Sequence, residues 1–400
     1  MMSVYGINPI GWFHSAFQLH KMLQMDGFLT LLIMGIGYMI VPRFRNIQLA
    51  SVKLAYVSFF LIITSVIFQI IQAIDNDKNM LIWIITISRI SGVIIFLMIL
   101  FWTMRVRPKL LGLSDYFIAL CLVNLITINV IDLTGYGHTN SLTYVQLWLL
   151  FPILMIYGIE YKTLPSFLGF IRPRKTFAIA SLASLSICMI SGLMSVIFMD
   201  MLVLSTIFNI TLFASTLTFA SAIYALGGFD NREIRRLIKG EKKARYNFTV
   251  IHIKISFLFL FIGIIISLLF NLFGRYFVFY DLAIHTIAIG YIGLTITLYL
   301  PLMLPPIIGK IILFTSLNKI PLFLIILSLT LRAVGDFILT QPSSSSSSYF
   351  GSLVGILQIL KYFFGISGWF IVLAMFVFVI MIHKSMKGVN TFASHNTNTF

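Results

Sequence analysis

The run Gly27-Phe-Leu-Thr-Leu-Leu-Ile-Met-Gly-Ile-Gly-Tyr-Met-Ile-Val-Pro42 contains no charged residue, and Arg43 and Arg45 follow it at once. A helix that crosses the hydrocarbon core of a bilayer needs about 20 mostly apolar residues. With the residues that precede it, this run predicts a membrane span over 18–41. Similar apolar runs recur along the whole chain, so the stretch is typical of a polytopic α-helical membrane protein.

The composition of the chain supports this class. Of 400 residues, 59% belong to the apolar set and only 10% are charged. Soluble domains carry roughly 25% charged residues, so an ordinary water-facing surface is excluded. The net charge of +16 would suit a nucleic-acid partner, but the basic residues fall in alternate loops, which indicates membrane topology instead.

We expect an all-α bundle of about eleven spans in a single integral membrane domain over 1–400 of a multi-pass cell-membrane protein. The fifth and sixth runs are long or closely spaced, which leaves a count of ten or twelve open. The expected spans are 18–41, 51–74, 80–103, 115–135, 144–166, 176–198, 201–226, 250–273, 282–305, 320–340 and 353–383.

The distribution of basic residues predicts the orientation. Bases follow every odd-numbered span, whereas the loops after even-numbered spans are poor in them. Cytoplasmic loops carry the excess of Lys and Arg, so the N-terminus is predicted outside and the C-terminus in the cytoplasm. The basic residues in question are Arg43, Arg45, Arg105, Arg107, Lys109, Arg172, Arg174, Lys175, the run Arg232 to Arg245, Lys310, Lys319, Lys384 and Lys387.

Two segments between spans have a marked composition. The cytoplasmic basic loop 227–247 is amphipathic in pattern and suits either a helix resting on anionic head groups or a docking surface for a cytoplasmic partner. The external loop 341–350 contains six serines and cannot build a core. Cys121 and Cys188 lie inside apolar runs, so neither a disulfide framework nor a thiolate metal site is expected.

Ionisable residues within spans are costly and indicate function. In the predicted topology most of them fall in the outer half of the membrane, on different helices. The residues are His20, Asp26, Arg89, Asp132, His252, Asp281, His285, Arg332, Asp336 and Lys361.

Two histidines at one depth suggest a haem site. Neutral imidazoles are axial ligands of haem iron, so His20 and His285 are candidate metal ligands for a haem b, with copper as another possibility. Asp281 precedes His285 by four residues and could orient its ring. Haem propionates bind cations, and the candidate cations on neighbouring spans are Arg89, Arg332 and Lys361.

Each candidate also has a simpler interpretation. His20 could be interfacial, and Lys361 could extend toward the head groups. Arg332 and Asp336 have the spacing of a local ion pair within one helix. Arg89 has no acidic residue three or four positions away, so a residue on another helix must compensate it, either through a propionate or through Asp132.

The first and ninth spans share a pattern that suggests an internal repeat over 18–44 and 282–306. Gly27 precedes Pro42 by fifteen positions, and Gly290 precedes Pro305 by the same fifteen. Each segment also contains a histidine before its glycine. The repeat is weak, but both helices have the same predicted direction.

The pattern His20-x3-Gln-x2-Gly-Phe28, followed by Pro-Arg-Phe44, resembles the NnrS family of membrane proteins and, more distantly, haem-copper oxidase subunit I. Segments 83–89, 328–332 and 368–374 are similar to other helices of that family. The resemblance implies a membrane protein that binds haem, with copper as another candidate metal, in nitric-oxide handling or respiration. An oxygen reductase is excluded, because its two haems and copper need more histidines than the three found within spans, His20, His252 and His285.

Three functions from different classes follow. The first is the membrane subunit of a b-type cytochrome electron-transfer complex, such as the hydrophobic subunit of an archaeal cytochrome b558/566-type complex, working between quinol and an external cytochrome. This would be a subunit rather than a stand-alone enzyme. The second is a nitric-oxide response protein like those of the NnrS family. The third is a cofactor-free transporter or membrane anchor.

Overall fold

The computed structural model describes residues 19–74, 79–106, 112–134, 141–168, 172–199, 201–225, 239–274, 276–307, 309–310, 314–339 and 351–387. The serine-rich loop expected over 341–350 and most of the basic loop expected over 227–247 lie outside these residues. Across the described part of the chain the ordered elements are helices, with no β-strand among them.

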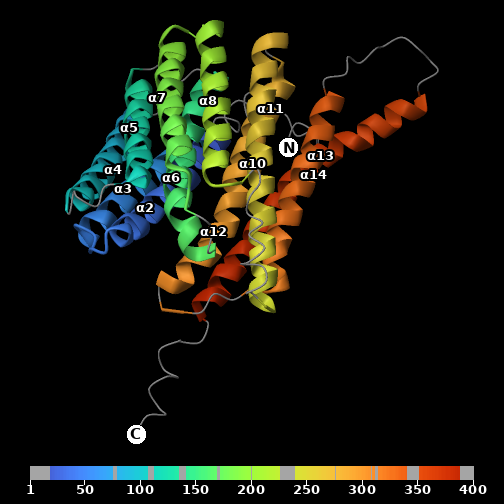
Figure 1. The fold of residues 1–400 in the computed structure, drawn as a ribbon. Helices are drawn as coiled ribbons and strands as arrows, with labels where there is room; N and C mark the ends of the chain where they lie inside the picture. The colour runs from blue at the N-terminus through green and yellow to red at the C-terminus, as the bar shows by residue number, and fades with distance from the viewer. Residues whose placement is uncertain are drawn as a thin grey trace. The chain divides into compact units, whose positions relative to one another are not determined.

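Eleven helices within the described residues are long and apolar enough to cross a membrane (Figure 1). The predicted all-α class and the predicted eleven membrane-length helices are therefore confirmed for this part of the chain. In order, the elements are η2 (Leu23–Thr30), α2 (Leu31–Phe44), α3 (Val52–Ile74), α4 (Asn79–Arg105), α5 (Leu113–Leu133), α6 (Leu142–Leu168), α7 (Lys175–Ile197), α8 (Leu202–Ala222), α10 (Glu241–Phe273), α11 (Phe277–His285), η5 (Thr286–Gly293), α12 (Leu294–Ile307), η6 (Ser316–Lys319), α13 (Ile320–Leu339) and α14 (Gly351–Lys387).

The largest difference from the expected boundaries is at α10. We expected the eighth span to begin at 250, after a loop that extends to 247, but the helix begins at Glu241. The residues between, Glu-Lys-Lys-Ala-Arg-Tyr-Asn, include several strong helix formers, and helix propensity does not require an apolar side chain. The last part of the expected loop therefore continues α10 beyond its apolar region.

The chain, expected to be one membrane domain, gathers its helices in two compact units. The N-terminal unit comprises the described residues of 7–166 and 178–208, and the C-terminal unit those of 167–177 and 209–400. In the N-terminal unit α3 and α4 pack side by side; in the C-terminal unit α13 and α14 do so, and α10 packs on α11 and η5 (Figure 1).

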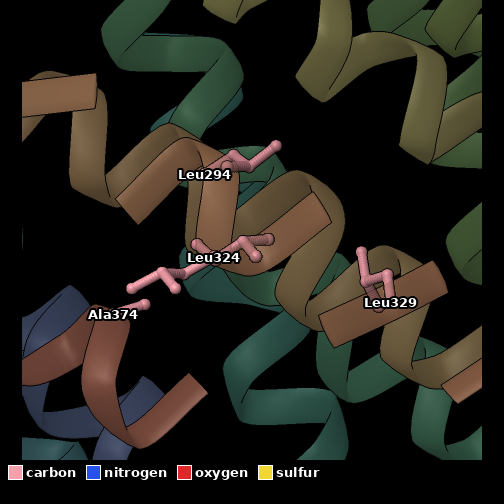
Figure 2. Close-up of a cluster of buried hydrophobic side chains, with 5 residues drawn as sticks. Leu294, Leu324, Leu329 and Ala374 are labelled. Carbon is pink, nitrogen blue, oxygen red and sulfur yellow. The ribbon is translucent and has the colours of Figure 1, made fainter. Parts of the chain in front are cut away.

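The C-terminal unit has an apolar core where α12, α13 and α14 meet. Leu294, Leu324, Leu329 and Ala374 come from these three helices and, with Ile325, form one cluster of buried side chains (Figure 2). Between membrane-spanning helices the stabilisation comes from van der Waals contact of these side chains, because lipid tails are as apolar as leucine. This core fixes α13 beside the helix that follows η5.

In the N-terminal unit, a buried ion pair connects the end of α2 to the start of α5. Arg45 Nη2 lies 3.3 Å from Asp115 Oδ1, and these side chains are 1% and 3% exposed. Asp115 also accepts a hydrogen bond from the backbone N–H of Gly112 (2.8 Å), which satisfies a donor just before the first turn of α5. Lys162 of α6 donates to the backbone carbonyl of Phe44 (2.6 Å), so three helices are joined at this end.

Candidate functional site

The C-terminal unit holds a buried ion pair between α11 and α13. Arg332 Nε lies 2.5 Å from Asp281 Oδ2, and Arg332 Nη2 lies 2.7 Å from Asp281 Oδ1. Two parallel hydrogen bonds of this kind fix the guanidinium and the carboxylate in one plane and add to their electrostatic attraction. Asp281 is 5% exposed, so its carboxylate is shielded from water, and the Arg332 side chain is 17% exposed.

His285 is oriented by the same aspartate. Its Nδ1 lies 2.8 Å from the backbone oxygen of Asp281 and 3.3 Å from Asp281 Oδ1. A carbonyl oxygen only accepts hydrogen bonds, so Nδ1 is the donor in this contact, and a neutral ring of this tautomer has its lone pair on Nε2. Histidines that ligate metals are usually held by such a contact from their other ring nitrogen.

Asp336 completes what we call the Arg332 cluster, defined as Asp281, His285, Arg332 and Asp336. It lies one turn beyond Arg332 on α13 and is 1% exposed. Arg332 donates its two hydrogen bonds to Asp281, which lies on a different helix, α11. The cluster thus joins two helices that are distant in sequence.

His285 is the last residue of α11 and stands directly before the π-helical segment η5. The first span also contains a π-helical segment, η2, that is followed directly by an α-helix. In each, eight π-helical residues are followed by fourteen α-helical residues. Gly27 and Gly290 are each the fifth residue of their π-helical segment. Such segments are rare and often mark functional sites.

A further histidine within the spans, His252 of α10, also contacts this region. Its Nε2 lies 3.0 Å from the backbone oxygen of Leu294, the first residue after η5. The carbonyl accepts, so Nε2 donates. We assign His252 a structural role, because it supports the helix that follows the π-helical segment.

The N-terminal unit holds a second buried charge cluster, centred on Arg89 of α4. Arg89 Nη1 lies 2.9 Å from Asp132 Oδ2 of α5 and 3.4 Å from Asp26 Oδ2 of η2. Gln69 of α3 donates from Nε2 to Asp26 Oδ2 (2.8 Å). Tyr144 of α6 donates its hydroxyl to Asp132 Oδ1. Asp26, Gln69, Arg89, Asp132 and Tyr144 together are the Arg89 cluster.

Two further residues border the Arg89 cluster. Trp148 donates from its ring nitrogen to the Tyr144 hydroxyl at 2.8 Å. The Lys21 ammonium lies 4.9 Å from the centre of the Tyr144 ring, over its face. A cation above an aromatic face is attracted by the ring. Lys21 is in the first turn of the first span, so it lies beside the cluster at the N-terminal end of this span.

All members of the Arg89 cluster lie toward the same end of their helices. Asp26 and Arg89 are in the first halves of the first and third spans, and Gln69 is near the end of the second. Asp132 lies one residue before the end of the fourth span, and Tyr144 lies in the first turn of the fifth. Because consecutive spans alternate in direction, these positions share one depth, which the predicted topology makes the outer half of the membrane.

The structure brings some of the predicted site residues together. Asp281, His285 and Arg332 share one cluster, and Arg89 meets Asp132, the partner that the sequence left open for it. His20 is exposed and belongs to the N-terminal unit, whereas His285 belongs to the other. Lys361 is in α14, and its side chain lies outside the described part of the structure.

Sequence reasoning did not connect Asp26 with Arg89, and it missed Gln69, Tyr144 and Trp148. Asp26 and Arg89 are 63 positions apart, so no helical spacing joins them. The other three carry no charge and were not among the ionisable candidates. Their common depth near the ends of two expected spans was the signal that could have found them.

The residues present fit a haem only in part. Haem iron takes axial nitrogen ligands. His285 contacts Asp281 through Nδ1, and metal-bound histidines usually make a contact of this kind with their other ring nitrogen. Arg89 and Arg332 already neutralise buried carboxylates, so their charges are accounted for without haem propionates. Among the described residues no three His, Cys, Asp or Glu side chains gather to hold a metal ion, and copper stays a prediction from the sequence.

No protein-family model and no curated protein matches the chain. The resemblance to the NnrS family therefore stays a prediction based on the quoted motifs.

Proposed function

We propose that this chain is the membrane subunit of an electron-transfer complex and that it holds a b-type haem through His285. The observation that carries the proposal is the contact of His285 Nδ1 with both the backbone oxygen and the carboxylate of Asp281. It presents Nε2 as the ligating nitrogen. A bound haem would supply one-electron redox chemistry at this depth.

The chain's own residues would each have a defined part. Asp281 holds the imidazole in one tautomer and one orientation, as a carboxylate or carbonyl does beside many metal-bound histidines. Arg332 fixes Asp281 from α13 with two hydrogen bonds, so that the carboxylate cannot turn away. Quinol and an external cytochrome remain the proposed partners, and His20 as a second ligand stays a prediction from the sequence.

A cofactor-free transporter is the second candidate, and one observation favours it. Transporters often interrupt helices at corresponding positions of repeated halves, with charged residues nearby. Here η2 and η5 occupy matching positions in the first and ninth spans, each beside an Asp–Arg pair. This arrangement would serve an ion or proton pathway without any cofactor.

The absorption spectrum of the purified full chain distinguishes the two candidates. The haem proposal predicts a Soret band and an α band that sharpens when the protein is reduced. A preparation that is colourless after expression in a haem-sufficient host, and that stays colourless when haem is added, would contradict it and leave the transporter. Proton or ion flux into proteoliposomes would then test the second candidate.

A further inference from the structure

We propose that Arg174 binds the phosphate of an anionic phospholipid, where α7 begins and α8 ends. The Arg174 site is defined as Arg174, the exposed bases Arg172 and Lys175, and the aromatic residues Phe177 and Tyr224. All five residues belong to the C-terminal unit. The inference does not depend on the haem proposed above.

The Arg174 side chain lies against two aromatic rings. Its Cζ is 4.9 Å from the centre of the Tyr224 ring and 5.7 Å from the centre of the Phe177 ring. Its backbone N–H donates to the carbonyl oxygen of Ala222, the last residue of α8, at 3.0 Å. A guanidinium stacked on aromatic faces is attracted to them, and its N–H donors lie in its own plane. The rings therefore hold the cation in place and leave its donors available to a ligand.

The charge of the Arg174 site is not used within the described part of the chain. Arg172, Arg174 and Lys175 are exposed, and none of them forms an ion pair with a carboxylate among the described residues. Three bases within four positions repel one another, and a bound anion relieves this repulsion. A guanidinium can bind phosphate through two parallel hydrogen bonds, so phosphate suits the site.

The backbone of Tyr224 is a second, independent observation. Its φ is +63°, in the left-handed region that glycine usually occupies. The N–H of Ala225 donates to the carbonyl of Ala220 at 2.7 Å, and the N–H of Tyr224 donates to that of Ser221 at 3.4 Å. This is the pattern that ends many helices with a glycine at the position of Tyr224. A bulky residue in a strained conformation favours a functional role, and here its ring holds Arg174.

The position of the Arg174 site favours a lipid as the source of the phosphate. Arg174 directly precedes α7, which is long and apolar enough to cross a membrane, so the site lies at the level of the head groups. Phe177, in the first turn of α7, is 40% exposed. In the predicted topology this edge is cytoplasmic, and the cytoplasmic leaflet contains the anionic lipids.

Native mass spectrometry of the full chain in a neutral detergent tests this proposal. Titration with phosphatidylglycerol and, separately, with phosphatidylcholine gives the affinity for the first bound lipid of each kind. We expect the anionic lipid to bind more tightly. Arg174→Gln should lower the affinity for phosphatidylglycerol about fivefold, the loss expected for one basic residue at an anionic membrane surface. It should leave the affinity for phosphatidylcholine unchanged.

Arg105→Gln is the matched control, because it removes the same charge on the same predicted side. Arg105 is exposed at the end of α4 and contacts no aromatic ring among the described residues. The variant should keep the affinity for phosphatidylglycerol. An equal loss in Arg105→Gln and Arg174→Gln would overturn the proposal, since the net charge alone would then set the affinity.

Tyr224→Gly keeps the test decisive if Arg174→Gln does not fold. Glycine suits the positive φ, so the unfolding midpoint should not fall, whereas the affinity for phosphatidylglycerol should fall severalfold because the ring is lost. Unchanged affinity in Tyr224→Gly, or equal affinity of the unmodified chain for both lipids, would overturn the proposal. Displacement of the lipid by an equal concentration of inorganic phosphate would also overturn it, because the site would then bind the free anion.

Discussion

Arg332 and Asp281 are 51 residues apart in the chain, yet they form two parallel hydrogen bonds between α13 and α11. The pair fixes the aspartate that orients His285. The structural support and the proposed ligand therefore depend on the same carboxylate.

The Arg332–Asp281 pair should be costly to break from one side. Arg332→Gln leaves a buried carboxylate without its cation, and such a loss costs about 3–5 kcal/mol. Arg332→Gln combined with Asp281→Asn removes both charges and should recover part of this stability. Thermal unfolding of the detergent-solubilised variants measures the difference. Equal stability of the single and double variants would show that the pair is not coupled.

Arg89 should be a structural counter-ion for Asp26 and Asp132. We expect Arg89→Gln to lower the stability by about 3–5 kcal/mol, because both carboxylates lose their shared cation. Arg89→Lys should rescue only in part, since an ammonium does not reproduce the guanidinium fork. Unfolding midpoints and haem content should be measured together. Loss of haem with unchanged stability would instead favour a propionate partner.

How far the sequence predicts this molecule depends on the range of each interaction. The spans followed from hydropathy alone, and the Asp281–His285 contact followed from a spacing of four residues on one helix. The Asp26–Arg89 and Asp281–Arg332 pairs join different helices, and a single sequence carries no signal for such a pairing. The π-helical conformation of η2 and η5 was also not predicted. A long run of apolar residues has nearly the same sequence pattern whether the helix is α-helical throughout or widens locally to a π-helix.

The absence of a side chain at Gly290 should be required for η5 to pack against Phe259 and Leu329. A Cβ there would lie 2.8 Å from Phe259 Cβ and 3.0 Å from Leu329 Cδ1. Overpacking of this kind costs about 1–3 kcal/mol, so Gly290→Ala should lower the unfolding midpoint. Gly35→Ala is the matched control, because a Cβ at that position meets nothing within 4 Å. If both variants unfold alike, the packing at Gly290 does not limit stability.

The predicted orientation can be tested with reporters. A fusion after Lys109 should be active as a cytoplasmic reporter, and one inserted within Ser343–Ser348 should behave as external, because basic loops remain in the cytoplasm. Both positions lie outside the described helices. A cytoplasmic serine-rich loop would invert the orientation and place both charge clusters in the inner half of the membrane.

If His285 holds a haem, the molar ratio of haem to purified chain depends on this side chain. His285→Ala should lower this ratio severalfold relative to the unmodified protein, because the ligating nitrogen is lost. His383→Ala should leave the ratio unchanged, since His383 is exposed near the end of α14. Both variants must first be shown to be folded. If folded His285→Ala binds as much haem as the unmodified protein, His285 is not the ligand and the proposed function loses its support.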